Sequence, residues 1–216
     1  MDELAAFGTT AHYYKGELLL RPSDSNDEIF LLRKGIVRSY TISSSGDKNI
    51  QLMYQTAEIF PVAHLVNKRL QNVYYEAITD CEVVRIPAPK VTAYLQQHDR
   101  VGFEVLGKVI QEFIVYKARV DVLEYRFARE RVAYQLLLLS KRFGRVEDEQ
   151  IIMPHFSQDV LAESCNVSRE SVNRELKRFE RLGYLRREQG QLHIVDPVSM
   201  RKQVAPLDTP LFIDDL

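Results

Sequence analysis

The sequence has few cysteines and no long apolar run, and each absence excludes a class of protein. Cys81 and Cys165 lie far apart and form no CxxC motif, so neither a disulfide framework nor a zinc site is predicted. No apolar run approaches the roughly 20 residues that a membrane span needs. The first residues, MDELAAFGTT, lack the basic start and apolar core of a signal peptide. We therefore expect a cytoplasmic protein that makes no membrane contact.

An excess of charge of one sign is also lacking, because the net charge is −1 over 216 residues. A hydrophobic content of 45% and a charged content of 27% are typical of a globular protein. A near-neutral chain has no general attraction to nucleic acid, so any contact with DNA must come from a local basic patch. The length allows one large domain or two small ones.

Short β-type segments dominate residues 13–87. The segment 28–42 carries β-branched and aromatic residues on both sides of a Lys34-Gly35 turn, and a polar turn cluster follows at 43–49. Several short strands at close spacing predict an all-β sandwich or barrel within residues 1–98. A domain of this kind is compatible with many functions.

A long helix is predicted next, over residues 99–128. Apolar side chains recur in it at alternating steps of three and four, which is the a/d pattern of a coiled coil. The pattern favours a seam between two identical helices, and therefore a homodimer. A helix that lies on the core of its own domain is the alternative. The predicted interface residues are Leu106, Val109, Phe113, Tyr116, Val120, Leu123 and Phe127.

Two short helices joined by a tight turn are predicted in the C-terminal part. Ser157 is placed to cap the first helix, and Ser168 is placed to cap the second. The turn is Cys165-Asn166-Val167, in which asparagine tolerates the left-handed conformation better than most residues. The predicted inner face of the second helix consists of Val172, Leu176, Phe179 and Leu182.

Further elements flank this helix pair. A helix over about 129–143 precedes it, with Gly144 as its expected stop, and the polar segment GRVEDEQ is interpreted as a connection. Two short strands around Gln189-Gly190 follow as a β-hairpin wing. Residues 129–202 are therefore predicted to form a winged helix-turn-helix, and residues 203–216 form a tail.

The second helix concentrates positive charge on its outer face. Residues 168–187 include seven basic and three acidic side chains. Side chains near the N-terminal end of such a helix reach base edges when the helix enters the major groove. Arginine can donate two hydrogen bonds to guanine, and glutamate can accept one from cytosine. The predicted base readers are Arg169, Glu170, Asn173 and Arg174.

Other side chains of this module are expected to bind phosphates, which fixes register without reading sequence. The predicted phosphate contacts are Ser157, Gln158, Ser168, Ser171, Lys177, Arg178, Arg186 and Arg187. The alternative is a solvated helix surface with ion pairs between Glu170 and Arg174 and between Glu175 and Arg178. A carboxylate beside phosphates would be repelled, so Glu170 fits a base reader better than a purely electrostatic surface.

These segments resemble the cAMP receptor protein / fumarate-nitrate regulator (Crp/Fnr) family of bacterial transcription regulators. KGELLL, FLLRKGIVRSY, the long helix and SRESVNRELKRFERLGYL occur in the family's order over nearly the whole chain. The match is most specific at 168–174, which resembles the family's S-R-E-T-V-x-R recognition helix. The resemblance implies an α+β fold with an N-terminal β-jelly-roll like a cyclic-nucleotide-binding domain, a dimerisation helix and a C-terminal winged helix-turn-helix. It also implies inverted half-sites resembling TGTGA.

The chain departs from that family at two places. Glu175 stands where the family usually has an apolar residue. At the place of the family's phosphate cassette, Phe60-Pro61-Val62-Ala63-His64 and Gln71-Asn72 lack its glycine, glutamate and arginine. A cyclic phosphate would then lack its guanidinium and backbone donors, so the effector is predicted not to be cAMP. The N-terminal segment has no cysteines for an iron–sulfur cluster, and the lone His12 and His64 are interpreted as solvated rather than as haem ligands.

Together these features predict a homodimeric transcription regulator that binds a palindromic DNA site through residues 168–182. Double-stranded DNA and a second copy of the chain are the predicted partners, and RNA polymerase and a small-molecule effector are further candidates. No catalytic residue, metal or cofactor is predicted. A cupin-like metalloenzyme or ligand-binding protein is the first alternative, but the five histidines are scattered along the chain. They are His12, His64, His98, His155 and His193. A regulator that binds other proteins through its β-domain is the second alternative, and it leaves the DNA-facing residues unexplained.

Overall fold

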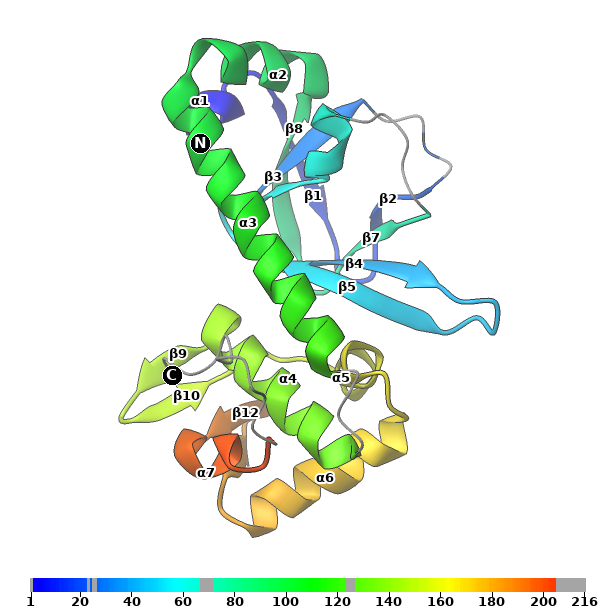
Figure 1. Ribbon diagram of the computed structural model, residues 1–216, viewed down its shortest axis with the longest axis vertical. Coiled ribbons are helices and arrows are strands. Elements are labelled where there is room, and N and C mark those ends of the chain that lie inside the picture. The colour runs from blue at the N-terminus through cyan, green and yellow to red at the C-terminus, as the bar shows by residue number, and fades with distance from the viewer. Residues whose placement is uncertain (1, 23, 25–26, 67–71, 123–126, 205–216) are drawn as a thin grey trace. The chain divides into compact units, whose positions relative to one another are not determined.

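The computed structural model describes residues 2–22, 24, 27–66, 72–122 and 127–204 (Figure 1). The chain divides into two compact units, Met1–Phe113 and Ile114–Leu216. The first unit contains two antiparallel four-stranded sheets, and the second contains a helical module with one four-stranded sheet. Among the described residues, no helix combines the length and the apolar character that crossing a membrane requires.

The first unit is the predicted β-sandwich, with jelly-roll-like sheets. One sheet has the order β1 (Thr9–Tyr13), β8 (Cys81–Pro87), β3 (Glu28–Lys34) and β6 (Ile59–Phe60). The other has the order β2 (Leu18–Leu20), β7 (Tyr74–Ala77), β4 (Val37–Ile42) and β5 (Lys48–Tyr54). Buried side chains from both sheets form one apolar cluster, in which Phe60 stacks on Phe30 at 5.6 Å and on Tyr75 at 5.4 Å between ring centroids.

The central residues of strand β3, Ile29–Leu32, are apolar in succession because both faces of the strand are covered there. Phe30 and Leu32 belong to the cluster between the sheets. Ile29 and Leu31 belong to a second cluster, which also contains side chains of α1 (Asp2–Ala5), α2 (Ala88–Gln97) and α3 (Asp99–Val122). A strand buried on both faces has no polar positions to alternate with apolar ones. Directly after β3, Gly35 adopts φ +99°. A Cβ on this residue would lie 2.6 Å from the Cys81 sulfur, so only glycine fits this turn.

The second unit contains the predicted helices and wing. Its helices are α4 (Ala128–Phe143), α5 (Gln158–Cys165), α6 (Arg169–Arg181) and α7 (Pro197–Arg201). Its sheet has the order β11 (Leu185–Glu188), β12 (Gln191–Ile194), β10 (Gln150–Ile152) and β9 (Arg145–Glu147). The wing hairpin turns at Gln189 and Gly190, as predicted from the sequence, and both residues have positive φ.

The polar segment after α4 is not a plain connection, so that interpretation was wrong. It forms the β9–β10 hairpin, which turns at Asp148 and Glu149 with φ of 46° and 63°. Strand β9 is exposed at the edge of the sheet, so it lacks the alternation of apolar residues that would reveal it. Gly144 does cap α4, but with φ −76° rather than in the left-handed conformation. Glycine fits because a Cβ there would overlap the Ser140 carbonyl.

Candidate nucleic-acid interface

The helix-turn-helix is built by local hydrogen bonds that its sequence predicts. The Ser157 side chain accepts a hydrogen bond from the backbone N–H of Val160 at 3.2 Å, and the Ser168 side chain accepts one from Ser171 at 3.2 Å. Asn166 adopts φ 51° and ψ 49°, the left-handed conformation. Both predicted caps and the predicted turn are therefore confirmed, and they set where α6 begins.

Two arginines far from the turn in sequence also hold it. Arg119 donates to the Asn166 side-chain oxygen at 3.2 Å, and Arg131 donates to the Asn166 backbone carbonyl at 3.3 Å. Burial lowers the pKa of Arg119 to about 10, which still leaves it charged at neutral pH. Sequence reasoning missed these contacts, because nothing in the local pattern connects residues so far apart. Helices α3 and α4 therefore supply part of the scaffold that positions α6.

The inner face of α6 packs as predicted at three positions and differs at the fourth. Val172, Leu176 and Phe179 are buried. Leu182 is 48% exposed, so its predicted place on the inner face was wrong. The helix ends at Arg181, and the chain turns at Gly183 with φ +74°, which takes Leu182 off the helical periodicity. A buried residue of β11, Leu185, follows the turn.

Hydrogen bonds link three predicted DNA-contacting residues, two on α6 and one on α5. Arg169 donates to the Gln158 side-chain oxygen at 3.4 Å and lies 3.5 Å from the Asp159 carboxylate. Gln158 in turn donates to the Asn173 side-chain oxygen at 3.2 Å. This network links α5 to α6 and holds Arg169 while leaving its side chain 60% exposed. The first turn of α6 thus carries an ordered set of hydrogen-bonding groups at the surface.

Glu170 is exposed beside Arg169 in the first turn of α6. Hydrogen bonds from its own backbone N–H and from the Ser168 side chain, together with the charge of Arg169, lower the pKa of Glu170. The carboxylate is therefore ionised at neutral pH and can only accept hydrogen bonds. An ionised acceptor at this place has the chemistry that an amino group of cytosine would satisfy.

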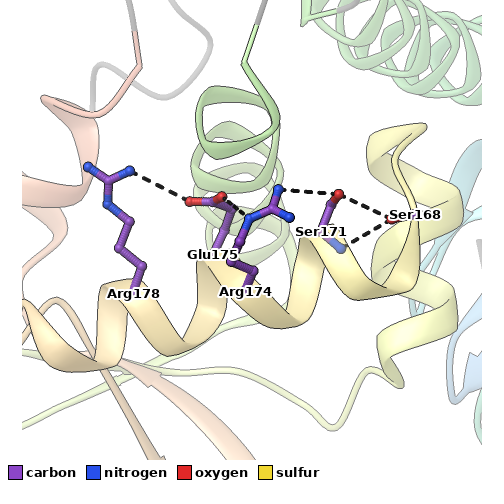
Figure 2. Close-up of polar contacts among 5 residues, drawn as sticks. All are labelled: Ser168, Ser171, Arg174, Glu175 and Arg178. Atoms are coloured by element: carbon purple, nitrogen blue, oxygen red, sulfur yellow. Dashed lines mark hydrogen bonds and ion pairs between the residues drawn. The ribbon is translucent and has the colours of Figure 1, made fainter.

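Arg174 is held by neighbours on the same helix, as Figure 2 shows. Its Nε donates to Glu175 Oε1 at 3.2 Å, and its Nη2 donates to Ser171 Oγ at 3.4 Å. Arg178 lies at 3.9 Å from the other Glu175 oxygen. The Glu175–Arg178 pair expected for a solvated helix surface is therefore present, but Glu175 itself is buried.

A groove of about 500 Å³ joins α6 to the wing. Lys177 lines it from α6, and Arg186 and Arg187 line it from β11. Arg187 pairs with Glu180 at 3.3 Å, and Arg186 pairs with Glu188 at 3.0 Å. The structure thus brings together three of the predicted phosphate contacts, which are separated in sequence by the turn after α6.

The predicted interface residues are largely uncovered, and those from Leu106 to Val120 lie on α3, whereas Phe127 is the N-cap of α4. Leu106, Phe113, Tyr116, Val120 and Phe127 are all exposed apolar side chains. Val109 is half-buried and lines a cavity of the first unit, and Leu123 lies outside the described residues. Two further exposed side chains of α3, Phe103 and Ile110, were missed because they fall outside the heptad pattern chosen from the sequence.

A cavity of about 680 Å³ opens in the first unit, beside the short 3-10 helix Val62–Leu65. Tyr54, Tyr75 and His64 line it together with mostly apolar side chains and the Glu112 carboxylate. Among the described lining residues there is no lysine or arginine. Burial raises the pKa of both Tyr54 and Tyr75, so these hydroxyls stay neutral and can donate hydrogen bonds.

The structure bears on two interpretations of the histidines, that His64 is solvated and that the chain holds a cupin-like metal site. His64 is only 4% exposed, so its interpretation as a solvated loop residue was wrong. It lies in the 3-10 helix after Pro61, a short element that the sequence pattern did not reveal. Among the described residues, no group of three or more His, Cys, Asp or Glu side chains is placed to hold a metal ion. The cupin-like alternative therefore finds no support in the side-chain arrangement.

Comparisons with known proteins agree with this order of domains along the chain. Residues 10–98 match the cyclic nucleotide-binding domain family, and residues 130–202 match the Crp-like helix-turn-helix domain family. The HTH-type transcriptional regulator ArcR of Staphylococcus haemolyticus is 29% identical over 174 residues, which cover 79% of this chain and 76% of that protein. The transcriptional activator protein Anr of Pseudomonas protegens is 23% identical over 93% of this chain and 81% of its own. The structure of FixK2 from Bradyrhizobium japonicum shares the fold, with a TM-score of 0.80 at 20% identity over 93% of this chain and 98% of that one.

Proposed function

Because the chain belongs to the Crp/Fnr family of bacterial transcription regulators, we propose that it acts as a homodimer on an inverted-repeat DNA site. In this proposal residues 1–98 form the sensor domain, 99–128 the dimerisation helix and 129–202 the DNA-binding domain. The observation that carries it is the first half of α6. There, the Ser168 cap and the buried inner face point Arg169 and Arg174 outward.

Helix α6 is the proposed recognition element, entering the major groove with its N-terminal half. Arg169 and Arg174 read guanine, Glu170 accepts from cytosine, and Asn173 completes the set of base readers. The caps of the two helices, polar side chains close to them, and basic side chains of α6 and β11 contact phosphates. They are Ser157, Gln158, Ser168, Ser171, Lys177, Arg178, Arg186 and Arg187. The ordered contacts within α5 and α6 support this division, since base readers need fixed positions.

The exposed apolar side chains of α3 support the proposed dimer. Large apolar groups such as Leu106, Phe113 and Val120 on one helix lose contact with water when a second copy covers them. Phe103 and Ile110 extend the proposed interface. A twofold dimer places two recognition helices roughly 34 Å apart, one turn of DNA, so each copy reads one half-site.

The cavity in the first unit is the proposed effector site. Its volume of about 680 Å³ is within the usual range for small-molecule pockets. The described lining offers no cation to a cyclic phosphate, which supports the prediction that the effector is not cAMP. Binding there would act by favouring one arrangement of the DNA-binding domains over another. RNA polymerase is the proposed partner through which bound dimers change transcription, in the cytoplasm and by binding rather than by catalysis.

Selection from a pool of random DNA duplexes tests the proposal. The full-length protein should enrich an inverted repeat whose half-sites are centred about 10 base pairs apart. The selection is run without a supplement and again with a fractionated metabolite extract, because an effector can change the binding-competent population. Enrichment of unrelated sequences, or of none in any arm, would contradict the proposed function.

A further inference from the structure

Glu175 is a charged residue at a buried position of the recognition helix. It is 7% exposed, and the next residue, Leu176, is 1% exposed. A buried carboxylate is unfavourable unless hydrogen bonds or cations compensate for the lost water. Glu175 therefore needs partners to remain buried, and the identity of those partners indicates its role in α6.

The main partner of Glu175 is Arg174, the residue next to it. Oε1 of Glu175 accepts from Nε of Arg174 at 3.2 Å, while the Arg174 side chain stays 63% exposed. On its other side, Arg174 donates from Nη2 to Ser171 Oγ at 3.4 Å, and Ser171 Oγ also accepts from the capping Ser168 hydroxyl at 3.1 Å. The guanidinium is thus held at two points by its own helix (Figure 2).

These contacts leave the outer edge of the guanidinium available. An arginine has five N–H donors, one on Nε and two on each terminal nitrogen. With Nε turned to Glu175 and one Nη2 hydrogen turned to Ser171, two donors on Nη1 and one on Nη2 remain. Two parallel bonds to O6 and N7 of guanine need only one donor from each terminal nitrogen. The geometry therefore favours an end-on approach of Arg174 to a base.

We propose that Glu175 is a positioning residue that holds Arg174 ready to read one base pair in each half-site. The inference rests on the proposed function, since it assigns Arg174 to base reading. A long side chain that is already held loses less freedom on binding than one that moves in solution. Because that advantage exists only where Arg174 meets its base, Glu175 contributes to sequence preference rather than to general attraction for DNA.

The weaker contact between Glu175 and Arg178 also indicates that Glu175 acts mainly on Arg174. Arg178 is 3.9 Å from Glu175, with no hydrogen bond at that distance, so Glu175 holds it less firmly than Arg174. Removing the carboxylate would raise the positive charge of α6, which strengthens contact with any phosphate. Loss of preference at one base pair, with equal or tighter binding to unrelated DNA, is therefore the expected signature. A purely structural role would weaken binding to all duplexes alike.

The experiment uses the full-length protein and the duplex that it selects from a random pool. Affinities are measured for that duplex and for a set in which each base pair of the half-site is changed in turn. Glu175→Leu removes the acceptor and suits a buried position, and Glu175→Gln keeps an oxygen acceptor without the charge. Glu180→Gln is the matched control, since Glu180 also lies on α6 but pairs with Arg187 of the wing at 3.3 Å.

Glu175→Leu should lower the preference about fivefold at one base pair, the same one at which Arg174→Ala loses preference. Glu175→Gln should lose about twofold there and nothing elsewhere, because a neutral acceptor makes a weaker bond. Adding Glu175→Leu to Arg174→Ala should give no further loss at that base pair, since Glu175 acts there only through Arg174. Glu180→Gln should change the affinity for every duplex by the same factor.

An equal change over all duplexes in both Glu175 variants would overturn the inference while leaving the proposed function intact. So would a loss of preference at a base pair other than the one that depends on Arg174. Should the leucine variant fail to fold, the glutamine variant has nearly the parent's shape and decides by the same criterion. If the parent itself selects no inverted repeat, the proposed function fails and the inference about Glu175 fails with it.

Discussion

The two units of this chain differ in how closely their residues follow the motifs expected for the family. In the second unit, α6 carries S-R-E-S-V-N-R with its polar side chains at the surface and its apolar ones buried. In the first unit, the segment interpreted from the sequence as the counterpart of the family's phosphate cassette includes the 3-10 helix Val62–Leu65. The described lining of the cavity beside it has no lysine or arginine.

This difference between the units shows that the residues that stabilise a fold are separate from the residues that give it a function. The sandwich depends on buried contacts such as the stack of Phe30, Phe60 and Tyr75, and none of these requires a particular ligand. A few exposed or cavity-lining side chains can then change without disturbing the core. The second unit is therefore expected to bind DNA as its family does, and the proposed sensor unit is expected to respond to a signal other than cAMP.

The largest effect is expected from disrupting the proposed dimer with Val120→Glu. A charge in the apolar stripe would have to be buried in the interface, which is strongly unfavourable. Light scattering should report monomers, and affinity for an inverted repeat should fall at least 100-fold, because linked half-sites bind about 10²–10⁴-fold more tightly. Gln111→Glu adds the same charge to a polar position of α3 and should leave the dimer intact. A dimeric Val120→Glu protein would refute the proposed interface.

A smaller, local effect is expected from Arg174→Ala. Removing a bidentate contact should cost about 1–3 kcal/mol at one base pair of each half-site and relax the preference there. The melting temperature should fall as well, because the buried Glu175 carboxylate loses its main hydrogen-bond donor. Competition binding with single-base variants of the selected duplex measures this. Parent-like preference at every position would remove Arg174 from the base readers.

A still smaller and uniform effect is expected from Lys177→Ala. Lys177 is exposed and borders the groove between α6 and the wing. Losing one phosphate contact should weaken binding to selected and random DNA equally, and should reduce the slope of log affinity against log salt by about 1. Lys202→Ala, at an exposed position after α7, should leave the slope unchanged. Loss on one sequence alone would contradict a phosphate role.

Addition of cAMP is expected to leave the melting temperature unchanged. This experiment tests the expectation for the first unit. A ligand that binds the folded state raises the melting temperature according to its concentration relative to Kd. At roughly 1 mM cAMP the melting temperature should stay where it is, whereas the selected duplex should raise it. A cAMP-dependent shift would mean that the sensor unit keeps the family's ligand despite the changed segment.

Local sequence was enough to predict much of the helix-turn-helix. The contacts that start and end these helices are local in sequence. Two serines, Ser157 and Ser168, cap the helices, and Asn166 adopts the left-handed turn. The wing turn at Gln189-Gly190 is equally local. The β9–β10 hairpin escaped prediction because its exposed edge strand has no apolar alternation to detect.

The sequence by itself determined the order of elements, the caps, the turns and which helix face is polar, because each depends on neighbours in the chain. Only the tertiary structure decided that His64 and Glu175 are buried and that Leu182 is not. It also decided that Arg119 binds Asn166 across 47 residues. Burial and long-range hydrogen bonds depend on which segments meet when the chain folds, and periodicity along one segment does not contain that information.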